Sequence, residues 1–497
     1  MSFEARQTGV RDALRFRFRD GEVVLRQFSP RATVLDWLRE EMGAKGTKEG
    51  CAEGDCGACT VVLARLRGGR LTYEPFNACI LLLGQLEGAE LITIEDLASG
   101  GELHPLQRAM VDTHASQCGF CTPGIVMSLF AAYHSGEPMT YAGLCDQLAG
   151  NLCRCTGYRP IIAAALQSGA SEPADRFAAT SHERAAALYA LADHKDVFVG
   201  GEAAFFAAPA SLDSLAALYA RFPDATLVGG ATDVGLWVTK QLRDLKRVIW
   251  LGRVAGLDSV GERTEDGALS IGAGVTLADA MPQLGAIHPD LGELLRRFGS
   301  KQVRASGTVG GSIANGSPIG DLAPALIALA GRVVLRKGGK TRAVPLEDFF
   351  IAYGKQDREP GEFVLALEAP LLAAHQRYRA FKVSKRFDED ISAVLLAARF
   401  DLDGRKIVGA RVACGGMAAT PKRAAKAEHA LVGASLDEPA TWRFAREAID
   451  EDFTPLTDMR ATAAYRKTIA ANLLEKALME ISGGSAQTRI GMLHAAE

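Results

Sequence analysis

The 497-residue sequence lacks a long apolar run and lacks a large excess of charge of either sign. Lys and Arg number 56 and Asp and Glu number 59, which leaves a net charge of −3. Because nucleic acids and anionic membrane surfaces are bound through clustered positive charge, we expect neither as a partner. No apolar run approaches the roughly 18 residues of a membrane-spanning helix, and the Arg-rich N-terminus has no apolar core of a secretion signal. We therefore expect a cytoplasmic protein, long enough for about three or four domains.

Cysteine is almost absent from the last two thirds of the chain. Nine of the ten cysteines lie before residue 156, and only Cys414 follows. Disulfides are rare in the reducing cytoplasm, so the crowded thiols predict local metal chemistry rather than cross-links. Cys414 lies among small residues, in VACGGMA, where a free cysteine is expected to fill a small buried space.

The sequence offers no arrangement that predicts acid–base or nucleophilic catalysis. Neither a Ser–His–Asp set nor a pair of carboxylates stands out, and the nine histidines are scattered. His104, His114 and His134, which lie near the cysteines, are expected to be surface groups or neighbours of metal ligands.

The first cysteine group has the spacing of a plant-type ferredoxin. In GCAEGDCGACTVVL, residues 50–63, three cysteines follow one another as Cys-x4-Cys-x2-Cys, and a fourth comes from a separate segment. Such a loop can enclose a [2Fe–2S] cluster, and its glycines let amide N–H groups approach the sulfurs. The alternative is zinc, which typically takes two Cys-x-x-Cys pairs and would leave Cys51 surplus. The group consists of Cys51, Cys56, Cys59 and Cys79.

The second cysteine group surrounds two expected helices. QCGFCTPG precedes and NLCRCTGYRP follows the segments 124–135 and 141–150, both of which have helical character. Antiparallel helices joined by a short turn would bring the four thiols to one end, whereas Cys145, inside the second helix, is expected to pack. Zinc is again the alternative. The group consists of Cys118, Cys121, Cys153 and Cys155.

Three glycine-rich segments follow in the rest of the chain. Residues 225–238 run as strand, glycine turn and helix, and residues 269–281 repeat the pattern with Thr276 as a helix cap. The third segment, residues 301–326, leads into an apolar helix. None matches the G-x-G-x-x-G fingerprint of dinucleotide-binding folds, and each alone is also explained by a tight turn without a ligand.

The cysteine motifs and the ordered glycine segments together resemble the molybdenum hydroxylase family, which includes xanthine dehydrogenases and aldehyde oxidases. The resemblance implies a multidomain α+β fold. Its expected parts are a β-grasp, ferredoxin-like [2Fe–2S] domain (10–98), a helical-bundle [2Fe–2S] domain (99–168), a linker ending in a surface helix (169–195), a two-subdomain α/β FAD-binding domain (196–370) and a C-terminal α/β domain (376–484). Hairpin-like alternation in 13–29, a helix capped by Thr33, and strands at 59–66 and 90–97 fit the first of these.

The resemblance also implies the cofactor-binding residues. The eight cysteines of the two groups would hold two [2Fe–2S] clusters, and Gln117 and Cys155 would lie against the pterin of a molybdenum partner. Two departures from the family pattern, Ser312 in place of Asn and Ala231–Asp233 in place of Asn-Thr-Glu, affect individual hydrogen bonds. The FAD-binding residues would be Leu227, Val228, Gly229, Gly230, Ala231, Thr232, Asp233, Val234, Phe298, Thr308, Val309, Gly310, Gly311, Ser312, Asp321 and Lys382.

By this resemblance the chain is the iron–sulfur and flavin subunit of a xanthine dehydrogenase. A separate molybdopterin subunit would oxidise hypoxanthine or xanthine to urate, and electrons would pass through the Cys118 group and the Cys51 group to FAD and then NAD⁺. The pair of subunits would double to a heterotetramer. The loop 386–390 would shape the NAD side of the flavin, where Phe387 and Glu389 leave the acceptor open. Two alternatives remain: the same subunit of an aldehyde- or N-heterocycle-oxidising enzyme, and a zinc–thiolate scaffold.

Overall fold

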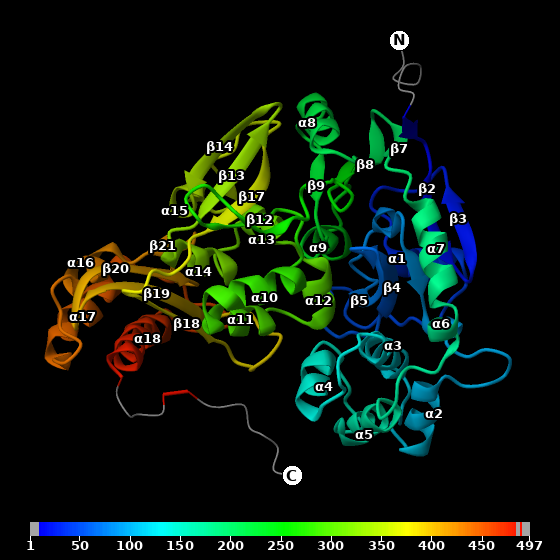
Figure 1. The fold of residues 1–497 in the computed structure, drawn as a ribbon, viewed down its shortest axis with the longest axis horizontal. Coiled ribbons are helices and arrows are strands. Elements are labelled where there is room, and N and C mark those ends of the chain that lie inside the picture. The colour runs from blue at the N-terminus through cyan, green and yellow to red at the C-terminus, as the bar shows by residue number, and fades with distance from the viewer. Residues whose placement is uncertain (1–8, 484–487, 490–497) are drawn as a thin grey trace. The chain divides into compact units, whose positions relative to one another are not determined.

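The computed structural model describes residues 9–483 and 488–489 and divides into two compact units (Figure 1). The first unit contains the chain up to residue 255 together with residues 299–307, and the second contains residues 256–298 and the chain from residue 308. The first unit therefore carries both cysteine groups, the first glycine turn and the start of the third glycine segment, and the second unit carries the second glycine segment and the third from residue 308.

The first unit begins with a mixed five-stranded sheet in the order β3-β2-β6-β4-β5. Alternating burial along β2 places Phe16 and Phe18 edge-on against Trp37. The expected hairpin, the strand at 59–66 and the Thr33 cap are confirmed. The strand expected at 90–97 ends at Ile92, because Thr93 caps a 3-10 turn that follows it. The elements are β2 (Leu14–Phe18), β3 (Gly21–Leu25), α1 (Val34–Asp36), a π-helical turn (Trp37–Glu41), β4 (Thr60–Arg67), β5 (Arg70–Asn77), η3 (Leu83–Leu86), β6 (Glu90–Ile92) and η4 (Ile94–Asp96).

Helices follow this sheet. The two helices expected between the second group of cysteines are confirmed as α3 and α4, with Thr140 capping α4. The helices are α2 (Pro105–Asp112), α3 (Thr122–Tyr133), α4 (Tyr141–Leu148), α5 (Arg159–Ser168), α6 (Arg176–Ala179) and α7 (Ser181–Leu191).

The segment expected as a linker is built into the fold. Helix α7 packs on the sheet against β2, β4 and β5 (Figure 1), with Leu188 and Leu191 buried. Arg184 is also buried; it pairs with Glu90, and its Nη2 lies 2.8 Å from the Asp20 carboxylate. The expected surface helix is therefore half-buried.

A second sheet completes the first unit, in the order β1-β7-β8-β10-β9, with α8 and α9 following β8 and β9 along the chain. Strand β10 runs parallel to both β8 and β9. Its elements are β1 (Val10–Arg11), β7 (Asp196–Gly201), β8 (Ala204–Ala208), α8 (Leu212–Arg221), β9 (Thr226–Val228), α9 (Val234–Thr239), β10 (Arg247–Trp250) and α12 (Lys301–Ser306).

The described part of the second unit holds one five-stranded, one four-stranded and one two-stranded sheet, in the orders β11-β12-β17-β13-β14, β18-β19-β20-β21 and β15-β16. Thr276 caps α10 as expected. Its strands are β11 (Val260–Arg263), β12 (Leu269–Gly272), β13 (Arg332–Lys337), β14 (Lys340–Pro345), β15 (Phe350–Ala352), β16 (Lys355–Gln356), β17 (Phe363–Ala369), β18 (Gln376–Val383), β19 (Val394–Asp403), β20 (Lys406–Gly415) and β21 (Lys422–Arg423). Its helices are α10 (Leu277–Ile287), α11 (Pro289–Arg296), α13 (Val309–Asn315), α14 (Leu322–Ala328), α15 (Leu346–Phe349), α16 (Ala425–Leu431), η5 (Pro439–Trp442), α17 (Arg443–Asp452) and α18 (Ala463–Ser482).

Two cysteines, Cys145 and Cys414, belong to neither of the two cysteine groups. Cys414 is fully buried, as expected, whereas the expectation that Cys145 packs is wrong because the α4 surface on which it lies is exposed. Among the residues that the structure describes, no helix combines the length and the apolar character needed to cross a lipid bilayer.

Candidate functional site

The four thiols of the first cysteine group converge in the first unit. Cys51 lies within hydrogen-bonding distance of Cys56 and Cys79, and Cys79 also reaches Cys59. The backbone N–H groups of Glu53 and Cys56 donate to the Cys51 sulfur at 3.4 Å. A loop that surrounds sulfurs with thiols and amides suits an iron–sulfur cluster, whose thiolate charge such donors stabilise.

The charges of these thiols compete with one another. Hydrogen bonds from Cys56 and Cys79 hold the pKa of Cys51 well below its ordinary value, and the hydrogen bond to Cys51 raises the pKa of Cys56. One thiolate is thus stabilised by neighbours that keep their protons. A cationic centre that accepts all four thiolates would remove this competition, because each sulfur would then neutralise positive charge.

The four thiols of the second group also meet. Cys118 pairs with Cys155, and Cys121 pairs with Cys153. Helix α3 begins directly after Cys121, and α4 packs against it, which returns the chain to the same end. Burial raises the pKa of Cys121 to about 12.

The segment after Cys153 folds back onto this cysteine. The Cys153 N–H donates to the Tyr158 hydroxyl oxygen at 2.7 Å, and the Thr156 hydroxyl lies 3.2 Å from the Cys153 sulfur. Burial would raise the pKa of Cys153, but hydrogen bonds from Thr156, together with those from Cys121 and Cys155, outweigh it and lower the pKa. The loop thus favours a thiolate, the form that binds metal.

The two cysteine loops touch through their backbones. The Leu152 N–H donates to the Cys56 carbonyl oxygen at 3.0 Å. Leu152 precedes Cys153 of the second group, so this hydrogen bond joins the second cysteine loop to a cysteine of the first group. Gly57 has a φ of +66°, and a Cβ placed on it would lie 2.1 Å from the Gly150 carbonyl oxygen. The approach therefore requires glycine at this position.

The first glycine turn lies against the segment that follows Cys79. The Gly229 carbonyl accepts hydrogen bonds from the Gln85 side chain at 3.2 Å and from the Trp250 indole at 3.1 Å. Gly235, near the start of α9, contacts the Ile80 side chain and carbonyl so closely that a Cβ would lie 2.6 Å from both. The structure thus places the turn expected to bind flavin directly beside the first cysteine group.

The turn itself has an unusual backbone. Leu227 and Val228 end β9, Ala231 adopts a left-handed φ of +62°, and α9 begins at Val234. The Ser306 hydroxyl donates to the Gly230 carbonyl at 2.5 Å. A sharp turn between a strand and a helix is a common setting for backbone contacts to a phosphate group.

A second set of expected flavin residues gathers in the second unit. Thr308 caps α13 by accepting from the Gly311 N–H at 3.0 Å, and the Val309 and Gly310 N–H groups donate to the carbonyls of Val275 and Ala273 at 2.9 Å. The second and third glycine segments therefore pair with each other. Ser312 lies within α13.

Asp321 and Lys382 form a buried ion pair of 2.8 Å in the second unit. The Ser392 hydroxyl donates to the other Asp321 oxygen at 2.5 Å, and the Lys382 ammonium also donates to the Arg297 carbonyl at 3.0 Å. Phe298 follows Arg297 in the chain. These contacts bring Asp321, Lys382 and the backbone beside Phe298 together.

The loop 386–390 is tied to α11 and the residue that follows it. The Arg297 guanidinium lies 4.5 Å from the centre of the Phe387 ring and donates to the Phe387 carbonyl at 2.9 Å. Arg296 lies 5.5 Å from the same ring and 3.3 Å from the Asp388 carboxylate. A stacked aromatic between two cations holds the loop in place.

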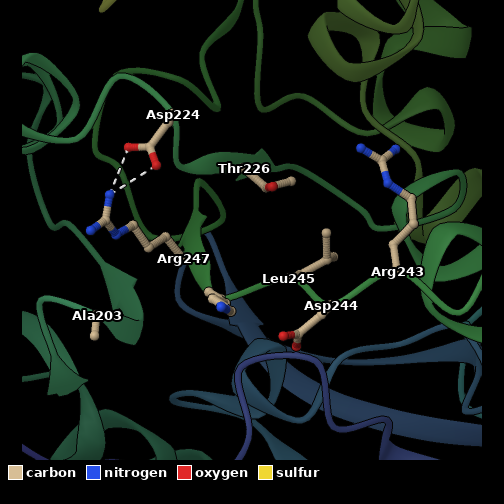
Figure 2. Close-up of a pocket in the computed structure, with 8 residues that line it drawn as sticks. Ala203, Asp224, Thr226, Arg243, Asp244, Leu245 and Arg247 are labelled. Atoms are coloured by element: carbon tan, nitrogen blue, oxygen red, sulfur yellow. Dashed lines mark hydrogen bonds and ion pairs between the residues drawn. The ribbon is translucent and has the colours of Figure 1, made fainter.

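A surface pocket of about 710 Å³, whose lining residues Figure 2 shows, lies at the amino-terminal ends of β9 and β10. Both acidic and basic side chains line the pocket, and Arg247 forms an ion pair with Asp224 there at 2.8 Å. Thr226 and Arg247 begin β9 and β10, whereas the glycine turn follows the carboxyl end of β9. Because ligands of parallel sheets bind at the carboxyl ends of the strands, we assign no ligand to this pocket.

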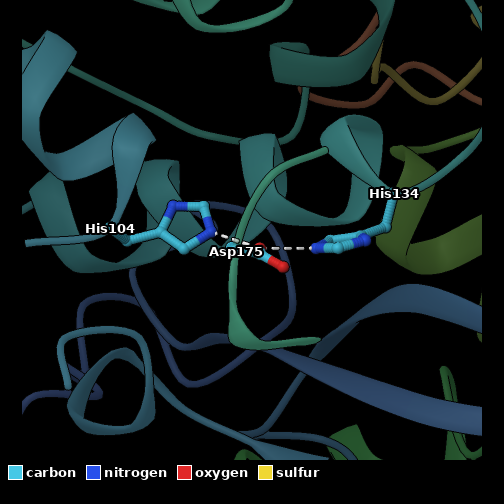
Figure 3. A group of neighbouring side chains, drawn as sticks. All are labelled: His104, His134 and Asp175. Atoms are coloured by element: carbon cyan, nitrogen blue, oxygen red, sulfur yellow. Dashed lines mark hydrogen bonds and ion pairs between the residues drawn. The ribbon is translucent and has the colours of Figure 1, made fainter. Parts of the chain in front are cut away.

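The expectation that His104 and His134 are surface groups or neighbours of ligands is wrong, since both rings are buried around Asp175 (Figure 3). Their Nε2 atoms lie 2.6 and 2.8 Å from the same Asp175 oxygen. The His104 Nδ1 accepts from the Leu106 N–H, so the proton of this ring is on Nε2 and no lone pair there faces a metal. The three side chains therefore form a buried, hydrogen-bonded structural cluster and not a metal site. A polar residue before Pro105 is a helix-cap signal that could have identified His104.

Asp175→Asn is expected to lower the free energy of unfolding by about 3 kcal/mol at neutral pH, because a buried acceptor is replaced by a donor facing an N–H group. Burial would raise the pKa of Asp175, but hydrogen bonds from His104 and His134 outweigh it and hold the pKa well below its ordinary value. This stabilisation is complete above pH about 4 and is lost as the pH falls through the lowered pKa of the folded state. Urea unfolding should show the difference from wild type shrinking in acid, whereas Asp112→Asn, at the exposed end of α2, should change stability by less than about 0.5 kcal/mol.

Comparison with protein families matches three parts of the chain. Residues 93–166 match a [2Fe–2S] binding domain, residues 201–372 match the FAD binding domain in molybdopterin dehydrogenase, and residues 379–481 match the CO dehydrogenase flavoprotein C-terminal domain. The second cysteine group and the glycine segments lie within the matched ranges.

Individual proteins give the same picture. The xanthine dehydrogenase of Emericella nidulans is 30% identical over 92% of this chain, and the chain spans 38% of its length. The solved structure of a Cu,Mo-CO dehydrogenase matches 56% of this chain and 97% of its own, at 25% identity and a TM-score of 0.52. Quinoline 2-oxidoreductase from Pseudomonas putida 86 matches 56% of this chain and 96% of its own, at 25% identity and a TM-score of 0.51.

Proposed function

Because this chain belongs to the molybdenum hydroxylase family, as its iron–sulfur and flavin portion, we propose that it carries electrons from a molybdenum centre through two [2Fe–2S] clusters to FAD. One observation supports this order best. Within the first unit, Leu152 bonds to Cys56, and Ile80, which follows Cys79, packs on Gly235 beside the glycine turn. The two thiol groups and the turn thus lie in series.

The residues fit these cofactors. The two thiol groups supply eight sulfurs, which is the number of protein ligands that two [2Fe–2S] clusters need. When bound, the clusters supply one-electron transfer and FAD collects electrons in pairs. The chain's own contribution is placement: Thr156 and Tyr158 orient Cys153, amides surround Cys51, and the turn 229–233 offers backbone N–H groups to an anionic dinucleotide.

The proposal also includes the domains of this chain, its partner subunit, the electron acceptor and the assembly of the enzyme. We assign the first sheet to a β-grasp ferredoxin-like domain, helices α2–α5 to a helical [2Fe–2S] domain, and the two later parts to a two-subdomain FAD domain and its C-terminal companion. A large molybdopterin subunit would oxidise xanthine or hypoxanthine, NAD⁺ would accept the electrons from FAD, and two such pairs would form a cytoplasmic heterotetramer. Exposed Cys118 and Cys155 favour a partner surface at the second group, because an exposed cluster is otherwise open to oxidation.

A second candidate is the same module serving another molybdenum hydroxylase. Among the solved structures that match are a CO dehydrogenase and a quinoline oxidoreductase, whereas the curated relative from Emericella nidulans is named a xanthine dehydrogenase. The partner subunit chooses the substrate. Isolation of the complex and assay with xanthine, an aldehyde and an N-heterocycle would separate the two candidates.

Both candidate functions require two [2Fe–2S] clusters and FAD, and cofactor analysis of the purified chain tests this requirement. We expect about four iron atoms, equal acid-labile sulfide and one FAD per chain, with two distinct paramagnetic signals after reduction. A colourless protein that holds zinc and no sulfide would overturn the proposal and support a zinc–thiolate scaffold.

A further inference from the structure

A buried hydrogen-bond network lies where the two cysteine loops meet. It consists of three side chains from distant parts of the sequence: Thr60 from the start of β4, Asn151 from the loop before Cys153, and Gln302 from α12. All three side chains are nearly inaccessible to solvent, and Gln302 is fully buried. The cofactor chemistry proposed above uses none of these residues.

The network ends on the backbone between two expected cluster ligands. Gly57 lies between Cys56 and Cys59, and its carbonyl accepts from the Thr60 hydroxyl at 2.7 Å and from the Asn151 amide at 3.1 Å. The same Asn151 amide donates to the Thr60 oxygen at 3.1 Å. Asn151 therefore holds the first cysteine loop from within the second.

Gln302, from helix α12, donates hydrogen bonds to both Asn151 and Thr60. Its side-chain amide donates to the Asn151 oxygen at 2.9 Å and to the Thr60 hydroxyl oxygen at 3.1 Å. The Gly57 carbonyl can only accept, so the Asn151 NH₂ must face it and the Asn151 oxygen must face Gln302. The backbone thus fixes the orientation of the whole network, and Gln302 is needed as a donor.

Helix α12 connects this network to the glycine turn. Ser306, at the end of α12, donates to the Gly230 carbonyl at 2.5 Å. At the other end, a Cβ on Gly150 would lie 2.2 Å from the Ser300 side chain, and Arg304 lies 3.2 Å from the Asp146 carboxylate of α4. One short helix therefore contacts the second cysteine loop, the first cysteine loop and the turn that we assign to flavin.

We propose that Gln302 is a positioning residue for electron transfer, which fixes the gap between the two iron–sulfur loops through Asn151 and Thr60. The inference rests on the function proposed above. Loss of the Gln302 donors leaves the Asn151 oxygen buried without a partner, so Asn151 rotates or draws in water and the Gly57 carbonyl loses a donor. The loops then separate, and electrons pass between them more slowly because tunnelling falls steeply with distance.

Gln302→Met tests this with the full-length chain, since methionine keeps the length of the side chain and removes both donors. The readout is the spin–spin splitting between the two clusters after reduction with dithionite, because the dipolar interaction falls with the cube of distance. We expect a smaller and broader splitting and a rate of electron transfer from the molybdenum partner to FAD that is several-fold lower. Gln302→Glu, which keeps the shape and replaces the donor with an acceptor, should give the same result.

Gln147→Met is the matched control. Gln147 is also buried, and its amide donates twice, to the Ser128 carbonyl and hydroxyl at 2.8 and 3.3 Å, but both partners lie within the helical part. This variant should lose stability and keep the wild-type splitting. If Gln302→Met and Gln302→Glu hold both clusters and keep the wild-type splitting, the positioning role is overturned. If the wild-type chain itself holds no clusters, the proposed function fails instead.

Discussion

We expect Cys153→Ala to remove about half of the iron and half of the acid-labile sulfide from the purified chain and to leave the bound FAD in place. Cys153 is buried, and its N–H and sulfur are held by Tyr158 and Thr156, so no other thiol can take its position. A [2Fe–2S] cluster needs four protein ligands, and only the second group loses one. The measurements are iron, sulfide and FAD content and the two paramagnetic signals after reduction, one of which should disappear.

The same helical part supplies the control. Cys145 lies on exposed α4, outside the converging thiols, so Cys145→Ala should keep the full iron content. In a complete enzyme, Cys153→Ala should abolish transfer of electrons from substrate to NAD⁺ while NADH still reduces a dye at the flavin. Equal loss of both activities, in a folded chain that retains FAD, would contradict the proposed order of the cofactors.

The cysteines show which parts of the site were predictable. Ligand spacing is a local property, and so the three thiols of residues 50–63 and the four of 118–121 and 153–155 could be predicted from those short stretches. Cys79, the fourth ligand of the first group, comes from a separate segment and is expected only once that spacing is recognised. Helices α3 and α4 and the caps at Thr33, Thr140 and Thr276 follow equally local rules.

Contacts between distant segments were not predictable. Gln302 lies 242 residues from Thr60 and 151 from Asn151, and α12 belongs to the first unit although the chain on both sides of it belongs to the second. Nothing in KQVRAS marks its glutamine as a donor to two other loops. His104 and Asp175 are 71 residues apart and illustrate the same limit: Pro105 marks His104 as a possible helix cap, but no local pattern places its ring beside a buried carboxylate.

These long-range contacts explain how one chain can position several cofactors. Ile80, Val228 and Ala231 share one buried apolar cluster, so the core of the first sheet continues into the glycine turn. A rigid core resists small displacements, because close-packed side chains leave no room to move. Under the proposed function, packing and the polar bonds of α12 would together set the distances between the cofactors.

Gly230→Ala is expected to release FAD while both clusters stay. A Cβ on Gly230 would lie 1.7 Å from the Ser306 carbonyl oxygen and 2.2 Å from its carbon, and both are backbone atoms that cannot rotate away. The turn must move by enough to break the bond from the Ser306 hydroxyl to the Gly230 carbonyl. Overpacking of this kind costs about 1–3 kcal/mol, and if the cost falls on the bound state alone, FAD affinity falls by roughly five-fold to 150-fold.

Gly201→Ala provides the comparison for this variant. Gly201 ends β7 in the same unit, and a Cβ on it would meet no atom within 4 Å, so FAD and iron contents should equal those of wild type. Flavin absorbance after gel filtration and the fluorescence of released FAD measure the loss, and iron and sulfide analysis shows that the clusters remain. Full retention of FAD by Gly230→Ala would mean that the turn 229–233 does not carry the flavin, because a backbone collision at its second residue cannot leave such a site unchanged.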